Sequence, residues 1–567
     1  MTVCHVLVVF TLQVGTAVAE DGARPGAAAT QRLGNTPVDI NSPPAYEPET
    51  DALGPEMDLG VSQDLRRLGL KPGLPEHEPA GMAAADATGA PVLELSVEQA
   101  VLKGLQNNRG LLVEQLNPVI TGTFEDIERA VFDPVVFAEF GYDREAVQQS
   151  DRATQQTFAV EGFGSDAAVG VRQSLPTGTD IELSLSQNRT DSDRTQRQYG
   201  TRAGITVTQA LLRGAGIDAN LASVRQAEVD TLLSVYELHG FTETLVADIE
   251  STYWDYVLAQ RRIEIFNKAL EVAKQQLDET EQRIRVGQLS ETEESSARAE
   301  VALRQQDLID ARSELEKTRL QLLQLTNPKT ATGWQQRIRA TADPQITAVP
   351  LDSPDERLAL AMRMRPELNQ ARLDIERGRL QVVETRNGLL PQLDVFLTLG
   401  KSSFSNSFNR SFDDFDGPSY DGGVGVNFEF PVRNRAAEAR YRSARATRDQ
   451  AELSLKNLAQ LVSLDIRTAF VEVQRTRQQI SASTATRELQ EQVLETEQVR
   501  FRVGESTSFD VALAQRDLIE SQIGEVEARV AHRKALIELY RLEGSLLERR
   551  GIDLPGSDKI NISTAGP

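Results

Sequence analysis

Two long stretches of the chain repeat their hydrophobic positions every three or four residues, the spacing of one face of an α-helix. The first, 216–286, predicts a helix of roughly 70 residues, about 105 Å long at 1.5 Å per residue. Its apolar positions include Ile263, Phe266, Leu270, Ala273, Leu277, Thr280 and Ile284. The second, 435–503, predicts a helix of about the same length. In 288–325, apolar residues recur every seven positions at Val301, Leu308, Leu315 and Leu322, so we expect coiled-coil packing.

Each long helix has two shorter helical segments as companions. The segments 97–130 and 288–325 together match the length of 216–286, and 354–387 with 505–542 match 435–503. We therefore expect each pair to lie end to end beside its long helix. The opposite faces of these helices are charged and should face water.

After each N-terminal short helix, the pattern changes to strict alternation, which predicts β-strands. The alternating runs are 169–175, 181–185, 203–211, 393–400 and 423–430. Each strand should be about 9–10 residues long, enough to cross an outer membrane at a tilt. The turn at 176–179 is short, whereas the connections 144–166, 189–201 and 401–421 are long and polar, as in transmembrane barrels. From the strands alone, hairpins on a soluble sandwich are the alternative.

The two halves are copies of one unit. At an offset of 217 residues, the motif RIRVG at 283–287 matches RFRVG at 500–504. We expect a first unit at 92–325, with strands at about 135–211, and a second at 351–545, with strands at about 393–430. A Thr- and Pro-rich linker, 326–350, joins them, and 546–567 forms a C-terminal tail.

The N-terminus predicts export. An apolar core precedes a small-x-small cleavage pattern at Ala17 and Ala19, so 1–19 is expected to be a signal peptide. Residues 20–91 are rich in Pro, Ala, Gly and acidic residues and predict a disordered tether. Cys4 precedes the apolar core, where a lipid-attachment cysteine does not belong.

The composition of the chain argues against several classes of function. The 567 residues carry a net charge of -23, which argues against nucleic-acid binding. One cysteine and four scattered histidines argue against a metal site, and no nucleophile–base pair or carboxylate dyad emerges, so we expect no enzyme and no cofactor. Beyond the N-terminus, no run of 18 or more apolar residues predicts a membrane-spanning helix.

The duplicated unit, the strands after each short helix, the run QALLRGAG at 209–216 and the Arg-x-x-Val-Gly turns resemble the TolC family of outer-membrane efflux channels. The resemblance covers about 92–545. It implies an α+β membrane protein and a homotrimer, in which a shared transmembrane β-barrel is continued by a long periplasmic α-helical, coiled-coil barrel. It also implies two partners, a periplasmic adaptor (membrane fusion) protein and an inner-membrane transporter of the RND, ABC or MFS type.

One feature departs from the family pattern. With a further strand beginning near 135, the first unit carries four strands where two are usual, which would give six strands per protomer and eighteen per trimer. The extra pair, 167–188, either joins the barrel or folds outside it.

The candidate sites lie at the turns that end the long helices. Gly287 and Gly504 are expected as left-handed C-caps, and Arg285 and Arg502 suit a helix C-terminus. By resemblance, these turns dock the adaptor. The docking residues would be Arg285, Val286, Gly287, Arg502, Val503 and Gly504.

Six residues after each glycine lies an acid, Glu293 or Asp510. Each completes a capping-box pattern, with Ser290 or Thr507. By resemblance, the alternative is an acidic gate at the periplasmic entrance, where threefold symmetry would bring the carboxylates together. Phe501 and Ser506 replace the Tyr and Arg that lock this entrance in the family, so a closed state must use other contacts.

These observations favour a passive duct in the outer membrane of a Gram-negative bacterium, with a large periplasmic part. It would export substrates as part of a tripartite efflux or type I secretion system. The alternative is a periplasmic coiled-coil scaffold without a pore, in which the strands form soluble hairpins.

Overall fold

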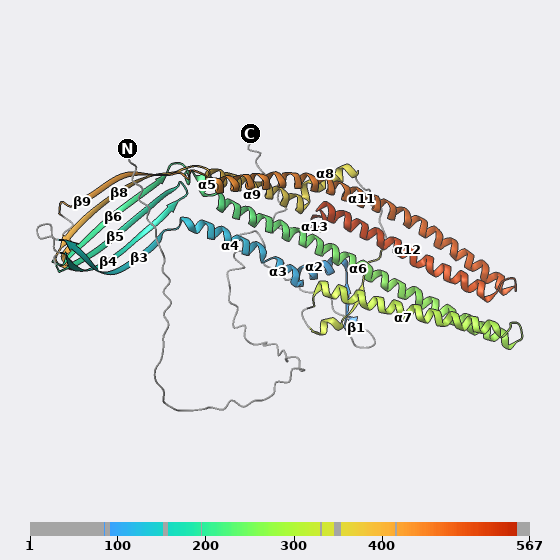
Figure 1. The fold of residues 1–567 in the computed structure, drawn as a ribbon. Helices are drawn as coiled ribbons and strands as arrows, with labels where there is room; N and C mark the ends of the chain where they lie inside the picture. The colour runs from blue at the N-terminus through green and yellow to red at the C-terminus, as the bar shows by residue number, and fades with distance from the viewer. Residues whose placement is uncertain are drawn as a thin grey trace, which may run out of the picture. The chain divides into compact units, whose positions relative to one another are not determined.

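The computed structural model describes residues 84–85, 91–150, 157–193, 196–328, 331–344, 353–413 and 417–552. The predicted signal peptide lies outside these residues, as does the predicted tether apart from 84–85 and 91. Among the described residues, the six strands of the larger sheet gather at one end and the long helices run away from them (Figure 1). No helix in these ranges is apolar over enough of its length to cross a membrane.

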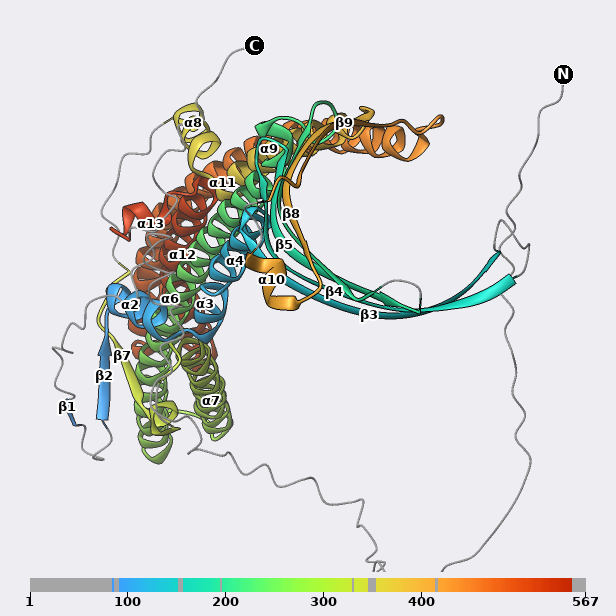
Figure 2. The same cartoon turned by 90° about the vertical axis from the view of Figure 1, so that its left-hand side faces the viewer.

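One antiparallel sheet holds six strands in the order β3-β4-β5-β6-β8-β9. The strands are β3 (Val135–Ser150), β4 (Thr157–Leu175), β5 (Thr179–Ser192), β6 (Gln198–Ala210), β8 (Gln392–Ser405) and β9 (Tyr420–Glu429). The extra pair of the first unit is β4 and β5, and it lies inside the sheet between β3 and β6. β3 and β9 form its two edges, and Figure 2 shows how strongly the sheet curves.

Most strands are longer than the sequence predicts. Only β9, with 10 residues, has the expected length, whereas β4 has 19 and β3 has 16. The additional residues come from stretches that the sequence assigns to long polar loops, so that prediction is wrong. Polar cross-strand pairs support the ladder there, such as Arg144 and Glu161, 2.9 Å apart.

The sheet has one apolar and one polar face, as the alternation predicts. Val171, Leu183, Ile205 and Leu399 stand side by side in register and are 38–57% exposed. We call this side the apolar face. The neighbouring row, on the other side, consists of Arg172, Glu182, Thr206 and Thr398. We call that side the polar face. Exposed rows of large apolar side chains require a partner other than water.

The long helices form two hairpins. α6 (Ala222–Arg285, 64 residues) pairs with α7 (Thr292–Thr326), and α11 (Arg435–Arg502, 68 residues) pairs with α12 (Ser508–Glu543). The two long predicted helices are confirmed. α6 starts later than expected because a separate short helix, α5 (Ile217–Asn220), precedes it.

The N-terminal companion of each long helix is broken, in contrast to the continuous helices predicted at 97–130 and 354–387. The first comprises α2 (Val97–Asn107), α3 (Arg109–Glu114) and α4 (Asn117–Arg129), and the second comprises α8 (Pro354–Met364) and α9 (Pro366–Asn387). Arg365 has a non-helical ψ of 121°, because the ring of the following Pro366 disfavours helical backbone angles at the residue before it. At the break between α2 and α3, the Asn108 side chain caps α3 by accepting from the Leu111 N–H at 3.1 Å.

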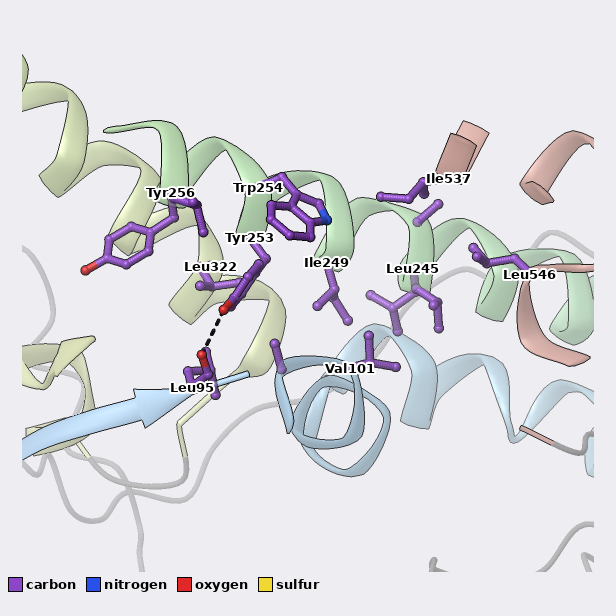
Figure 3. Close-up of a cluster of buried hydrophobic side chains, with 14 of the residues drawn as sticks. Leu95, Val101, Leu245, Ile249, Tyr253, Trp254, Tyr256, Leu322, Ile537 and Leu546 are labelled. Atoms are coloured by element: carbon purple, nitrogen blue, oxygen red, sulfur yellow. Dashed lines mark hydrogen bonds between the residues drawn. The ribbon is translucent and has the colours of Figure 1, made fainter. Parts of the chain in front are cut away.

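One of three buried hydrophobic clusters in the described residues, here called the core, lies where the two units meet the segments that join them (Figure 3). β1 (Ala84–Ala85), β2 (Pro91–Leu95) and β7 (Arg337–Ala340) form a small sheet, so the predicted linker 326–350 contributes a strand. The fully buried Tyr253 of α6 donates its hydroxyl to the Leu95 carbonyl at 2.9 Å, and Tyr256 donates to Ile338 at 2.5 Å. Burial raises the pKa of Tyr256 to about 12, which keeps this phenol a donor.

The described part of the predicted C-terminal tail belongs to this core. α13 (Leu546–Arg549) buries Leu546 and Leu547 almost completely. Next to it, Arg550 forms a two-pronged ion pair with the fully buried Glu250 of α6, at 2.5 and 2.6 Å. Residues 546–552 therefore join the C-terminal end to α6 of the first unit.

Candidate functional site: the hairpin tips

The two hairpins end in the same turn. Gly287 and Gly504 adopt φ values of 76° and 80°, so the predicted left-handed caps are confirmed. In each turn the next residue, Gln288 or Glu505, donates its N–H back to the carbonyl five residues earlier, at 2.9 Å. This is the Schellman arrangement, which satisfies the free carbonyls at a helix end.

The surface of each turn is exposed, with open space around its glycine. Val286 and Val503 are 69% and 66% exposed, and nothing lies within 4 Å of a Cβ added to either glycine. Arg285 and Arg502 fold back along their own helices, where each Nε donates to the carbonyl four residues earlier. The tips therefore present backbone and small apolar side chains.

Asp510 forms the capping box that the sequence predicts. Its N–H donates to the Thr507 hydroxyl oxygen at 3.2 Å, and its carboxylate accepts from the Thr507 N–H at 3.2 Å. The Thr507 hydroxyl also donates to this carboxylate, at 2.7 Å, and that hydrogen bond lowers the pKa of Asp510. Asp510 is thus an exposed anion at the start of α12.

Glu293 does not form the predicted capping box with Ser290. α7 begins after Glu291 without a side-chain cap, and the Ser290 hydroxyl oxygen accepts a bond from the Thr292 hydroxyl instead. The Glu293 carboxylate turns to α12 and accepts from the hydroxyl of Ser508, a residue only 5% exposed. A buried hydroxyl without a partner would cost free energy, and this contact removes that cost.

Contacts between the hairpins, which the sequence does not predict, continue along their length. The Arg283 guanidinium of α6 lies 5.0 Å from the ring centre of Phe501 in α11, a cation–π distance. Gln515 donates to Gln276 at 2.8 Å, and Lys534 pairs with Asp255 at 2.8 Å. Side chains on separate helices make these contacts, and no periodicity in either helix indicates them.

Phe501 and Ser506 therefore have contacts of their own at the hairpin tips. Phe501 is 9% exposed and packs under Arg283, while the Ser506 hydroxyl donates to Glu497 at 2.8 Å. The structure brings Glu293 next to the first turn of α12, where Asp510 completes the capping box of Thr507. Across the described ranges, no three His, Cys, Asp or Glu side chains are arranged to hold a metal ion.

Comparison with known proteins gives one family. The family model described as "Outer membrane efflux protein" matches residues 163–328 and 358–545, most of both units. The outer membrane protein TolC of Escherichia coli is 24% identical over 401 residues, covering 65% of this chain and 78% of that protein. The pyoverdine export outer membrane protein OpmQ of Pseudomonas aeruginosa is 27% identical over 187 residues. That match covers 32% of this chain and only 37% of OpmQ.

The fold is that of solved outer membrane channels. The Campylobacter jejuni CmeC outer membrane channel superposes with a TM-score of 0.59 at 15% identity. The superposition covers 81% of this chain and 90% of CmeC. At this identity the likeness concerns the fold alone.

Proposed function

The chain belongs to the outer membrane efflux protein family and is located in the outer membrane, and on that premise we propose that it is the channel of a tripartite efflux or type I secretion system. In this role it is a passive duct. A periplasmic adaptor and an inner-membrane transporter, of the RND, ABC or MFS type, supply its substrates from the periplasmic side.

The open six-stranded sheet is the observation that carries this proposal. Six strands are fewer than the eight of the smallest transmembrane barrels. An open edge in lipid leaves backbone groups unpaired, at several kcal/mol each. Pairing β9 of one copy with β3 of the next removes these edges, and three copies give a barrel of eighteen strands, wide enough for an aqueous channel.

The helices support the same assembly. Contacts run in the order α4, α6, α9, α11. α4 exposes Ile120, Phe124 and Ile127 at helical spacing, each 54–58% exposed. α11 exposes Leu453, Leu464 and Val471, each 62–65% exposed. When two different surfaces of a protein meet head to tail between neighbouring copies, the copies form a closed ring if the rotation from one to the next divides a full turn. In the proposed trimer, α4 of one protomer therefore packs on α11 of the next.

The bare turns at the tips suit adaptor docking. Backbone and small side chains at Val286, Gly287, Val503 and Gly504 allow a partner hairpin to approach closely. One arginine lies beside each turn, Arg285 at the first and Arg502 at the second. The same two turns in three copies offer six equivalent positions.

The contacts between the hairpin tips support a closed entrance in this conformation. Opening must separate Arg283 from Phe501 and Glu293 from Ser508, because these contacts join the two hairpins of a protomer. Asp510 keeps its negative charge as the capping-box partner of Thr507, and in a trimer it would add an acidic ring to the entrance. Capping and gating are therefore compatible roles of one carboxylate.

Purification separates this proposal from the scaffold alternative. A barrel protein needs detergent to leave outer membranes and elutes as a trimer, which light scattering measures. Extraction by salt or alkali alone, as a monomer with intact β-structure, would support a periplasmic scaffold.

A further inference from the structure

The connection between β8 and β9 contains a helix that packs against the sheet. This helix, α10 (Phe408–Asp413), contacts β6 and β8, and Figure 2 shows it beside the curved sheet. β8 follows α9 and β9 leads into α11, so the connection between the two strands lies at the end of the sheet away from the long helices. In a channel, a connection at this end has two places to fold, over the opening or against the outside wall. The strand register decides between them.

The residues beneath α10 belong to the apolar face. The Ser411 hydroxyl oxygen accepts from the Gln187 amide at 3.0 Å and from the Thr201 hydroxyl at 2.9 Å. Gln187 and Thr201 are register partners, and each lies four residues from Leu183 or Ile205 in the same strand. An even separation in a strand keeps side chains on one face. α10 therefore lies on the apolar face, about 13 Å beyond the row of Leu183 and Ile205 at 3.3 Å per residue.

α10 covers a polar row at the end of the apolar band. Thr201 and Ser403 are 1% and 3% exposed beneath it, and Ser411 of α10 itself is 0% exposed. The Ser411 hydroxyl also donates to the Phe408 carbonyl at 2.7 Å, so one side chain joins the helix to two strands. These hydrogen bonds hold α10 against the sheet, unlike a loop that only passes over it.

The outer surface of α10 is aromatic. Phe408 and Phe412 are 51% and 37% exposed, and their rings lie 5.4 Å apart. Tyr199 of β6 meets Phe408 edge to face at 6.1 Å. Below them, Lys401 stands in register with Tyr420, which is 84% exposed. Aromatic rings and a long cationic side chain at the end of an apolar band are typical of the lipid–water boundary.

We propose that α10 is an interfacial anchor that lies against the outer leaflet of the membrane, with Phe408 and Phe412 at the boundary between acyl chains and headgroups. The occupant of this surface is lipid. The connection carries Arg410 but also Asp413, Asp414 and Asp416, so its charge does not favour binding of phosphate headgroups. The inference rests on the proposed function, because only an inserted sheet has a lipid side.

Spin labels test this placement in the full chain. In a Cys4→Ser background, single cysteines replace Phe412, Val424 on the apolar face and Glu182 on the polar face. The labelled trimers are placed in phosphatidylcholine vesicles, and collision rates with oxygen and with a water-soluble nickel chelate give the depth of each label. We expect the label at 412 to lie in lipid, shallower than 424, with several-fold less nickel access than 182.

Three results would contradict the reasoning at different points. Nickel access at 412 as high as at 182 would place α10 over the channel and overturn the anchor. Protection of 412 from both reagents would mean that a neighbouring protomer, not lipid, covers α10. If 424 also lacks contact with lipid, the sheet is not inserted and the proposed function itself fails.

A second variant tests whether the hydrogen bonds of Ser411 hold α10 against the sheet. Ser411→Ala removes the acceptor shared by Gln187 and Thr201, so the label at 412 should become more mobile and gain nickel access several-fold. Unchanged mobility would show that Ser411 does not hold α10 in place.

Discussion

The ion pair between Arg550 and Glu250 offers the sharpest test of the packing. We consider the Arg550→Ala variant, in which Glu250 loses both of its hydrogen bonds to the guanidinium. Glu250 is 0% exposed, whereas the Arg550 side chain is 38% exposed. Removal of one partner from a buried pair costs about 3–5 kcal/mol, because an uncompensated charge stays behind. Since water reaches Arg550, we expect the low end, about 3 kcal/mol.

A double variant separates the ion pair from general packing. Glu250→Leu with Arg550→Met replaces the pair by apolar side chains, which is often neutral or stabilising. We therefore expect the double variant to be closer in stability to the parent protein than Arg550→Ala is. Arg298→Ala is the control, because Arg298 is 65% exposed and such surface pairs contribute at most about 1 kcal/mol.

The assay is guanidinium unfolding of the detergent-solubilised protein, followed by circular dichroism at 222 nm. A loss at Arg550→Ala no larger than at Arg298→Ala would refute the reasoning. Residues 546–552 would then be a tail after all, without a role in holding the C-terminal end to α6.

Three further predictions concern titration, docking and the gate. Burial raises the pKa of Glu243 to about 8, so the folded state holds a proton there and stability should fall as pH rises from about 4.5 to 8. Glu243→Gln should flatten that slope in unfolding midpoints, and an unchanged slope would contradict it. Gly287→Val or Gly504→Val should strain the turn by about 1 kcal/mol or more and weaken adaptor capture in a pull-down. If these variants instead fail to form trimers, the two glycines have only a structural role. Asp510→Asn should lower cation preference in planar bilayers while keeping the cap, and unchanged selectivity would leave capping as its only role.

Much of the architecture could be predicted because it depends on local periodicity. The two long helices follow from a repeat of three and four residues, and the two faces of the sheet from strict alternation. The glycines of the tips are equally local, since Gly287 and Gly504 adopt a left-handed conformation that other residues avoid. The capping box at Thr507 and Asp510 lies within four consecutive residues.

The parts that could not be predicted depend on contacts between distant segments. The strand ends are set by ladder pairing, so β3 and β4 continue through polar residues such as Arg144 and Glu161 without an alternating signal. Glu293 has a capping pattern in sequence, but a buried Ser508 on another hairpin attracts its carboxylate. The buried position of Leu547 depends on α6, some 300 residues away in the chain, as the pairing of Arg550 with Glu250 shows.

Planar-bilayer recording of the purified protein, in the proposed trimeric form, tests the central claim most directly. The account predicts steady ion conductance without an energy source. This conductance should be small in the parent protein if, as proposed, the contacts between the hairpins close the entrance. Conductance should rise in a Phe501→Ala variant, which removes the ring that Arg283 packs on. A trimer that inserts into the bilayer but never conducts, with or without Phe501, would contradict the claim that this protein is a channel.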